Sequence, residues 1–135
     1  MRHDSPARTT LRWVLATLYL AAGVIHLAMP APFLKITPAW VPDAPLVIML
    51  TGFCEIAGAM ALALIPRLRR AAGIAFAAYA ICVFPANIHH MMMDLARPDH
   101  GLGLGYHLPR MVLQPVLVWL ALWVSGIIDW PWRKR

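Results

Sequence analysis

The sequence predicts an all-α integral membrane protein, a bundle of four transmembrane helices. Of its 135 residues 61% are hydrophobic and only 13% are charged, and the mean hydropathy is +0.65, whereas soluble domains are roughly half apolar. The apolar residues also fall in four runs of about 20 residues, the length that crosses the hydrocarbon core of a bilayer. Because these runs use nearly the whole chain, we expect a single domain over residues 1–135 and no soluble catalytic domain.

The chain begins with a polar segment, residues 1–10, which we expect to be a disordered cytoplasmic tail. The first span is predicted at residues 11–29. A cleaved secretory signal peptide is the competing interpretation, because a basic start and small residues near the end of the run are typical of one. Gly23 and His26 favour a retained span, since a cleaved segment needs only apolar residues.

A proline-rich segment, residues 31–45, follows the first span. Prolines this frequent disfavour a regular helix, and the segment is too long for a tight turn. It also contains Trp40, and tryptophan is enriched where a membrane meets water. We therefore expect an interfacial loop that lies on the bilayer surface between helices 1 and 2.

The second and third spans each contain a residue that is costly in lipid. Residues 46–65 form the second span, which is interrupted only by Glu55. Residues 71–93 form the third, where Pro85 removes one backbone donor and leaves the carbonyl of Ile81 without its helical partner. Packing partners or water must satisfy these groups.

The fourth span is predicted at residues 109–128. It follows a polar, glycine-bearing loop at residues 94–107, and Pro109 suits the first turn of a helix, where no backbone donor is required. The tryptophans after the span are typical of an anchor at the membrane interface.

The distribution of basic residues predicts the orientation. Three fall in the first and third loops, and nine fall in the second loop and the two termini: Arg2, Arg8, Arg12, Arg67, Arg69, Arg70, Arg133, Lys134 and Arg135. Cytoplasmic loops carry the excess of Lys and Arg, so both termini are predicted on the cytoplasmic side of the membrane. The net charge of +6 does not indicate nucleic-acid binding, because the basic residues lie at the ends of apolar runs.

With this orientation, the polar residues of the spans lie mainly toward the outer leaflet, and Glu55 lies near the bilayer centre. The predicted ligand-binding or proton-handling residues are His26, Glu55, Asn87, Arg110 and Gln114. Helical spacing places Glu55 on one face with Gly52 and Ala59, where a second helix can approach closely. We therefore expect one outward-facing polar cavity between the four helices.

The sequence leaves the role of each polar residue open. Glu55 is either a proton carrier or ligand contact, or a carboxyl group that locks two helices together. His26 is either its hydrogen-bond partner or part of a binding site. The Asn87 amide can satisfy the carbonyl freed by Pro85, and Arg110 suits an interface anchor or a partner for Glu55 or an acidic ligand.

No metal site, disulfide or catalytic motif is expected. The run from His89 and His90 into three methionines offers copper ligands, but adjacent helical residues point about 100° apart and cannot share one coordination sphere. We assign His89, His90 and Trp40 as secondary candidates at the interface. Cys54 and Cys82 have no closely spaced partner, and the sequence holds no nucleophile paired with a base and no phosphate loop.

The sequence resembles the DoxX-like family of small four-helix bacterial membrane proteins over about residues 12–125. The resemblance rests on these segments: AGVIH at 22–26, FLKI at 33–36, PAWVP at 38–42, TGFCEIAG at 51–58, Pro66 with Arg69 and Arg70, VFPANI at 83–88, and RMVLQP at 110–115. The family takes its name from a subunit of a thiosulfate:quinone oxidoreductase, and some relatives are linked to thiol and oxidative-stress systems. The resemblance implies a role for the five predicted site residues, while the paired histidines at 89 and 90 depart from the pattern.

The leading functional hypothesis is a binding or accessory subunit of membrane redox metabolism, with a pocket for a quinone or another small amphipathic molecule. At most it would be a non-catalytic subunit of a quinone-linked oxidoreductase, with electrons supplied by the quinone or a redox partner protein. A second hypothesis is a small proton-coupled transporter or lipid-handling protein, which with four helices would need to form a homo-oligomer. A third is a structural assembly factor that binds no ligand.

Overall fold

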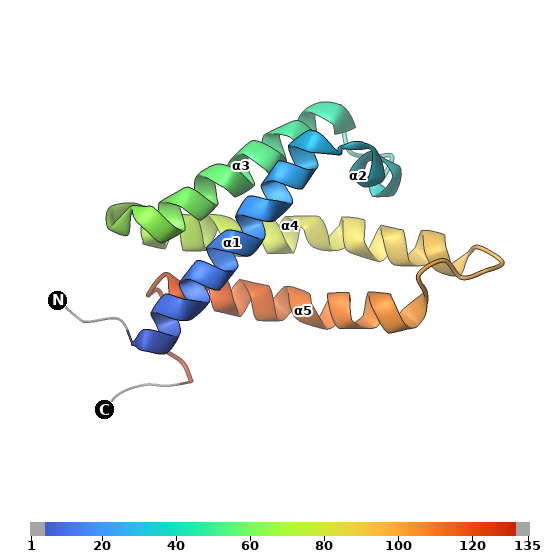
Figure 1. The fold of residues 1–135 in the computed structure, drawn as a ribbon. Helices are drawn as coiled ribbons and strands as arrows, with labels where there is room; N and C mark the ends of the chain where they lie inside the picture. The colour runs from blue at the N-terminus through green and yellow to red at the C-terminus, as the bar shows by residue number, and fades with distance from the viewer. Residues whose placement is uncertain (1–4, 132–135) are drawn as a thin grey trace.

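The computed structural model describes residues 5–131, so residues 1–4 of the predicted tail and the basic residues 133–135 lie outside the described residues. The described chain is helical and holds no strand (Figure 1). Its elements are α1 (Pro6–Ala28), α2 (Ala31–Ile36), α3 (Ala44–Leu64), the 3₁₀ helix η1 (Pro66–Leu68), α4 (Arg69–Leu95) and α5 (Gly103–Val124). By length and hydropathy α1, α3, η1 with α4, and α5 can each cross a membrane. The predicted all-α bundle of four membrane helices is confirmed.

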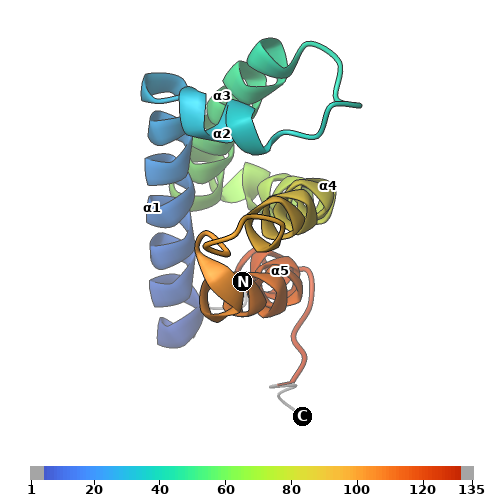
Figure 2. The same ribbon diagram turned by 90° about the vertical axis from the view of Figure 1, so that its right-hand side faces the viewer.

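The long helices form two pairs. α1 packs along α3, and α4 packs along α5. The end-on view of α4 and α5 in Figure 2 shows the two pairs side by side, with α2 across one end. In Figure 1, α1 runs obliquely from the α2 end of the molecule to the C-terminal end of α5. Residues from all four long helices can therefore meet between the pairs.

The buried core lies where α1 reaches the other three helices. Leu15, Leu62 and Val124 are almost fully buried there, and Tyr19 stacks on Phe76 with ring centroids 3.9 Å apart and planes inclined by 6°. Many large apolar side chains instead face outward from the bundle. Such a surface suits lipid rather than water, where large exposed apolar patches are rare.

Glycine allows α1 and α3 to approach each other closely. A Cβ atom on Gly23 would lie 2.7 Å from the carbonyl oxygen of Gly52, and one on Gly52 would lie 3.1 Å from the carbonyl oxygen of Gly23. A side chain at Gly23 therefore requires a backbone shift, and one at Gly52 also meets the Leu27 side chain at 2.9 Å. This contact confirms the small-residue helix face predicted around Glu55.

Two arginines at the start of α1 bind the end of α5. The buried Arg12 donates from Nε to the carbonyl of Val124 at 3.0 Å. Arg8 lies 2.7 Å from the Asp129 carboxylate and 4.9 Å from the centre of the Trp123 ring. The last carbonyls of a helix lack intrahelical donors, and Arg12 supplies one to the carbonyl of Val124. From the sequence alone, both arginines contribute only to the predicted orientation.

Two predicted helix starts are wrong. α1 begins at Pro6, within the predicted tail, because the Ser5 side chain caps it by accepting from the Arg8 N–H at 3.2 Å. α5 begins at Gly103, so Pro109 lies inside the helix and not in its first turn. Pro109 leaves the carbonyl of Gly105 without a helical donor, which is tolerated close to a helix end that water can reach.

Two predicted loops also differ. The proline-rich segment opens with the short helix α2, whose proline lies in the first turn and therefore costs no hydrogen bond. α4 extends to Leu95 and takes in Asp94, which had been placed in the loop. Asp94 remains helical because its carboxylate accepts the Leu102 N–H at 3.0 Å and so ties the following turn back to the helix.

Candidate functional site

His26 and Glu55 form a buried pair between α1 and α3. His26 Nδ1 lies 2.7 Å from Glu55 Oε2, and their side chains are 11% and 3% exposed. Nδ1 also meets the geometry of a hydrogen bond to the carbonyl of Ala22 at 3.0 Å, whereas its contact with Glu55 is close without that alignment. Because both neighbours are oxygen acceptors, Nδ1 carries a hydrogen. The Phe33 ring of α2 covers the imidazole at 3.8 Å between ring centres.

Arg110 joins α5 to α4. Its Nη2 donates to Asn87 Oδ1 at 2.5 Å, and its Nη1 lies 3.1 Å from His90 Nδ1. A guanidinium has only donors, so His90 Nδ1 accepts here. The guanidinium also lies over the Tyr106 ring, 5.2 Å from its centre. Pairing with Glu55 was one of the alternatives predicted for Arg110. The structure instead gives Arg110 Asn87 and His90 as partners.

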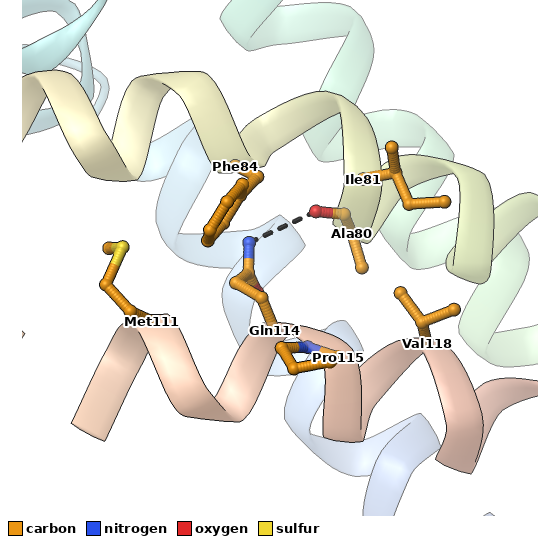
Figure 3. A pocket seen from close by; sticks show the side chains of 7 residues that line it. All are labelled: Ala80, Ile81, Phe84, Met111, Gln114, Pro115 and Val118. Carbon is orange, nitrogen blue, oxygen red and sulfur yellow. Dashed lines mark hydrogen bonds between the residues drawn. The ribbon is translucent and has the colours of Figure 1, made fainter. Parts of the chain in front are cut away.

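Gln114, not Asn87, supports the backbone near Pro85. The Gln114 side chain is buried and donates from Nε2 to the carbonyl of Ala80 at 3.1 Å (Figure 3). This carbonyl is the neighbour of the one that Pro85 frees at Ile81. The structure does not show Asn87 as the partner of the freed carbonyl: the hydrogen bond described for its side chain is the one that its Oδ1 accepts from Arg110.

These polar groups surround a cavity of about 250 Å³, called the polar cavity below. Four of the five predicted site residues line it, and Glu55 lies behind His26. The lining residues come from α1, α2, α3, α4, α5 and the segment after α2: Tyr19, His26, Phe33, Ile36, Thr37, Ile48, Tyr79, Ala80, Val83, Ala86, Asn87, Arg110, Gln114 and Leu117. The structure thus brings together the residues that the sequence analysis grouped by depth.

The three secondary candidates, Trp40, His89 and His90, differ in their position relative to the polar cavity. Trp40 is 71% exposed in the segment between α2 and α3 and does not line the polar cavity. His89 does not line it either. His90 contacts Arg110 and so lies beside the cavity.

A second cavity, the lateral groove, was missed by the sequence analysis. It has a volume of about 400 Å³ and lies between α4 and α5 (Figure 3). Its lining is almost wholly apolar: Ala80, Ile81, Phe84, Met111, Gln114, Pro115 and Val118. Ala80 and Gln114 line both the groove and the polar cavity. Prolines on both facing helices were the available signal, because helices often bend at proline.

A third group of polar residues closes the end of the α4–α5 hairpin. Asp94 Oδ2 lies 2.9 Å from Nε2 of the fully buried His107 and 3.6 Å from Nε2 of His90. Asp94 and His107 are the two ends of the segment that the sequence predicts as a loop, residues 94–107. The i, i+4 spacing of His90 and Asp94 was the signal available for this pair, since residues at that spacing are neighbours on one face of a helix.

The fold and cavities define a class: a small multi-pass membrane protein with a ligand-sized polar cavity that adjoins an apolar groove between two helices. Within that class, the chain belongs to the DUF8561 family, described as a domain of unknown function, whose family model matches residues 15–125. No curated protein and no solved structure matches the chain.

Proposed function

We propose that this protein binds a quinone-like amphipathic molecule, with its polar head in the polar cavity and its apolar tail in the lateral groove. The observation that carries the proposal is that the two cavities adjoin and share two lining residues, Ala80 and Gln114. A molecule that is polar at one end and apolar at the other matches this arrangement. Ligand sites typically combine an apolar lining with a few polar groups that fix orientation.

The polar cavity offers polar side chains suited to a carbonyl or hydroxyl head. Arg110 enters it from α5 and His26 from α1, so two different helices approach the same space. Glu55 behind His26 supports the imidazole and offers a site to hold a proton. The protein would supply hydrogen bonds and a proton, while electrons come from the quinone or a redox partner protein.

The lateral groove supports access from the bilayer. Ile81 and Pro115 on its rim are exposed on the outer surface of the bundle, where we place lipid. An isoprenoid or acyl tail can therefore lie between α4 and α5 without crossing water. The resemblance to DoxX-like proteins favours a quinone over other amphipathic molecules. We place the protein in the bacterial inner membrane with cytoplasmic termini, so the polar cavity faces outward.

The test is the quinone content of the purified full chain after incubation with decylubiquinone in detergent micelles. Arg110→Gln removes the charged donor, and a charged hydrogen bond contributes about 1.5–3 kcal/mol, so we expect quinone affinity to fall at least about tenfold. Arg97→Gln is the matched control, since Arg97 pairs with Asp99 at 3.0 Å on the exposed loop away from the cavity. Equal affinity in both variants would contradict the proposal.

A structural role without a ligand is the second candidate, because the same polar contacts join helices. Arg110 links α5 to α4, and His26 with Glu55 links α1 to α3. If Arg110→Gln and Glu55→Gln lower thermal stability while the wild-type protein takes up no quinone, this role is favoured. Proton-driven uptake in vesicles that Glu55→Gln abolishes would instead indicate a transporter.

A further inference from the structure

We infer that His90, Asp94 and His107 form a binding site for one divalent transition-metal ion, with Zn²⁺ the best match. The site lies at the end of the α4–α5 hairpin and is separate from the quinone-binding proposal. The sequence predicts no metal site in the run from His89 to Met93, because adjacent residues on a helix point about 100° apart. The ligands come instead from one turn of α4 and from a facing helix.

The distances between the donor atoms fit a common ion. One donor atom from each residue lies within 4.8 Å of the other two. Asp94 Oδ2 is 2.9 Å from His107 Nε2 and 3.6 Å from His90 Nε2. Zinc bonds of about 2.0–2.2 Å in a tetrahedron place ligand atoms roughly 3.3 Å apart. Side-chain rotations that move the donor atoms by a few tenths of an ångström to about 1.5 Å relative to one another therefore suffice.

The surroundings hold the carboxylate in place. Asp94 accepts the Leu102 N–H at 3.0 Å, across the turn that joins α4 to α5. Gly101 in that turn has a φ of +52°, and a Cβ atom there would lie 2.4 Å from the Asp94 carboxyl carbon. Only glycine allows the backbone to approach this closely. Supporting contacts of this kind orient metal ligands.

The donor set defines the ion. Two imidazoles and one carboxylate suit zinc and other first-row transition metals, and three protein ligands leave a coordination position for water. Calcium and magnesium are excluded as first choices because they prefer oxygen ligands. His107 is fully buried and the His90 ring stands 4.9 Å from it, edge to face, so the two imidazoles are already neighbours.

Metal binding would change the Arg110 contact. Without metal, the Nε2 hydrogens of both histidines point to Asp94 and His90 Nδ1 accepts from Arg110. A metal on His90 Nε2 moves the ring hydrogen to Nδ1, which then repels the guanidinium. Arg110 keeps its bond to Asn87 and releases His90. Because Arg110 lines the polar cavity, metal occupancy alters the charge distribution there.

The experiment measures zinc in the full chain, purified in detergent, stripped with a chelator and reloaded with Zn²⁺. We expect about one equivalent by mass spectrometry in the wild type, and a loss of most of it in His90→Ala and Asp94→Asn. His89→Ala is the matched control, because the neighbouring residue points about 100° away on the helix. It should retain the wild-type stoichiometry.

A second readout separates metal binding from folding. Tetrahedral Co²⁺ absorbs visible light when bound by nitrogen and oxygen ligands, so loading with Co²⁺ should produce these bands in the wild type and His89→Ala but not in His90→Ala. Circular dichroism and size-exclusion chromatography check that each variant is folded. If wild-type protein takes up no more Zn²⁺ and Co²⁺ than folded His90→Ala, the three residues are only a hydrogen-bonded cluster and the inference is overturned.

Discussion

His26 and Glu55 show how an ionisable pair is accommodated within a membrane helix bundle. Both side chains lie where two glycines let α1 and α3 touch, so neither is directed at lipid. Burying either residue alone is costly, since an unpaired charge loses its hydration. The two residues therefore depend on each other, and changing both should cost less than the sum of the single changes.

A double-mutant cycle measures this dependence. His26→Ala and Glu55→Gln should each destabilise the protein, and the double variant should be about 1–3 kcal/mol more stable than additivity predicts. The measurement is unfolding in mixed micelles followed by circular dichroism. Thr51→Ala on the same helix, whose hydroxyl bonds only within α3, serves as the additive control with His26→Ala. Full additivity of the first pair would show that the two groups do not interact.

At the scale of helices, the two pairs meet by different means. α1 and α3 meet through backbone contact at glycines, whereas α4 and α5 are linked by polar side chains that reach across, such as Arg110 and Gln114. The first contact was predictable, because small residues at helical spacing mark a seam. The lateral groove was not, because its shape depends on how two proline-containing helices bend.

The glycine contact makes a prediction about stability. Gly23→Ala places a Cβ 2.7 Å from a backbone oxygen that cannot move alone, so we expect a loss of about 1–3 kcal/mol. Gly105→Ala in α5 is the control, since nothing lies within 4 Å of its Cβ position. It should leave stability unchanged or raise it by up to about 1 kcal/mol, because alanine favours a helix. Equal effects in unfolding experiments would argue against the close approach.

The lateral groove makes a prediction about binding. Val118→Trp should fill part of the groove and lower decylubiquinone uptake, while leaving the polar cavity residues unchanged. Val112→Trp is the control on the same helix, because Val112 is 67% exposed and lies outside the groove. Bound quinone is measured by chromatography after extraction. If both variants bind as much quinone as the wild type, the tail does not lie in this groove.

On the scale of the whole molecule, the amino-acid sequence was sufficient for the class of fold and for four polar residues that line the polar cavity, His26, Asn87, Arg110 and Gln114. Both follow from hydropathy and from the energetic need to keep polar groups out of lipid. The contacts between those residues were less predictable. Glu55 was one of the partners predicted for Arg110, but Arg110 contacts Asn87 and His90. Asp94 and His107 were missed because a polar stretch near a helix end is indistinguishable from a loop until the turn is seen to fold back.

The even number of spans makes a prediction about topology. Arg8 and Asp129 are 2.7 Å apart, so the two ends of the described chain lie on one side of the bundle. A fluorescent protein fused to the C-terminus should fluoresce in the bacterial cytoplasm, and an alkaline phosphatase fused there should be inactive. An N-terminal fluorescent fusion should behave like the C-terminal one. An active phosphatase at the C-terminus would place the polar cavity on the cytoplasmic side.

The arginine contacts between α1 and α5 are gathered at one extremity of the bundle, while the polar cavity lies toward the other. The two helix pairs are therefore joined by arginine contacts at the end of the bundle away from the polar cavity. A separation of the two pairs at the cavity end would pivot about Arg8 and Arg12 and would increase the distance between His26 and Arg110. Such a movement would enlarge the polar cavity around a bound molecule without unfolding any helix.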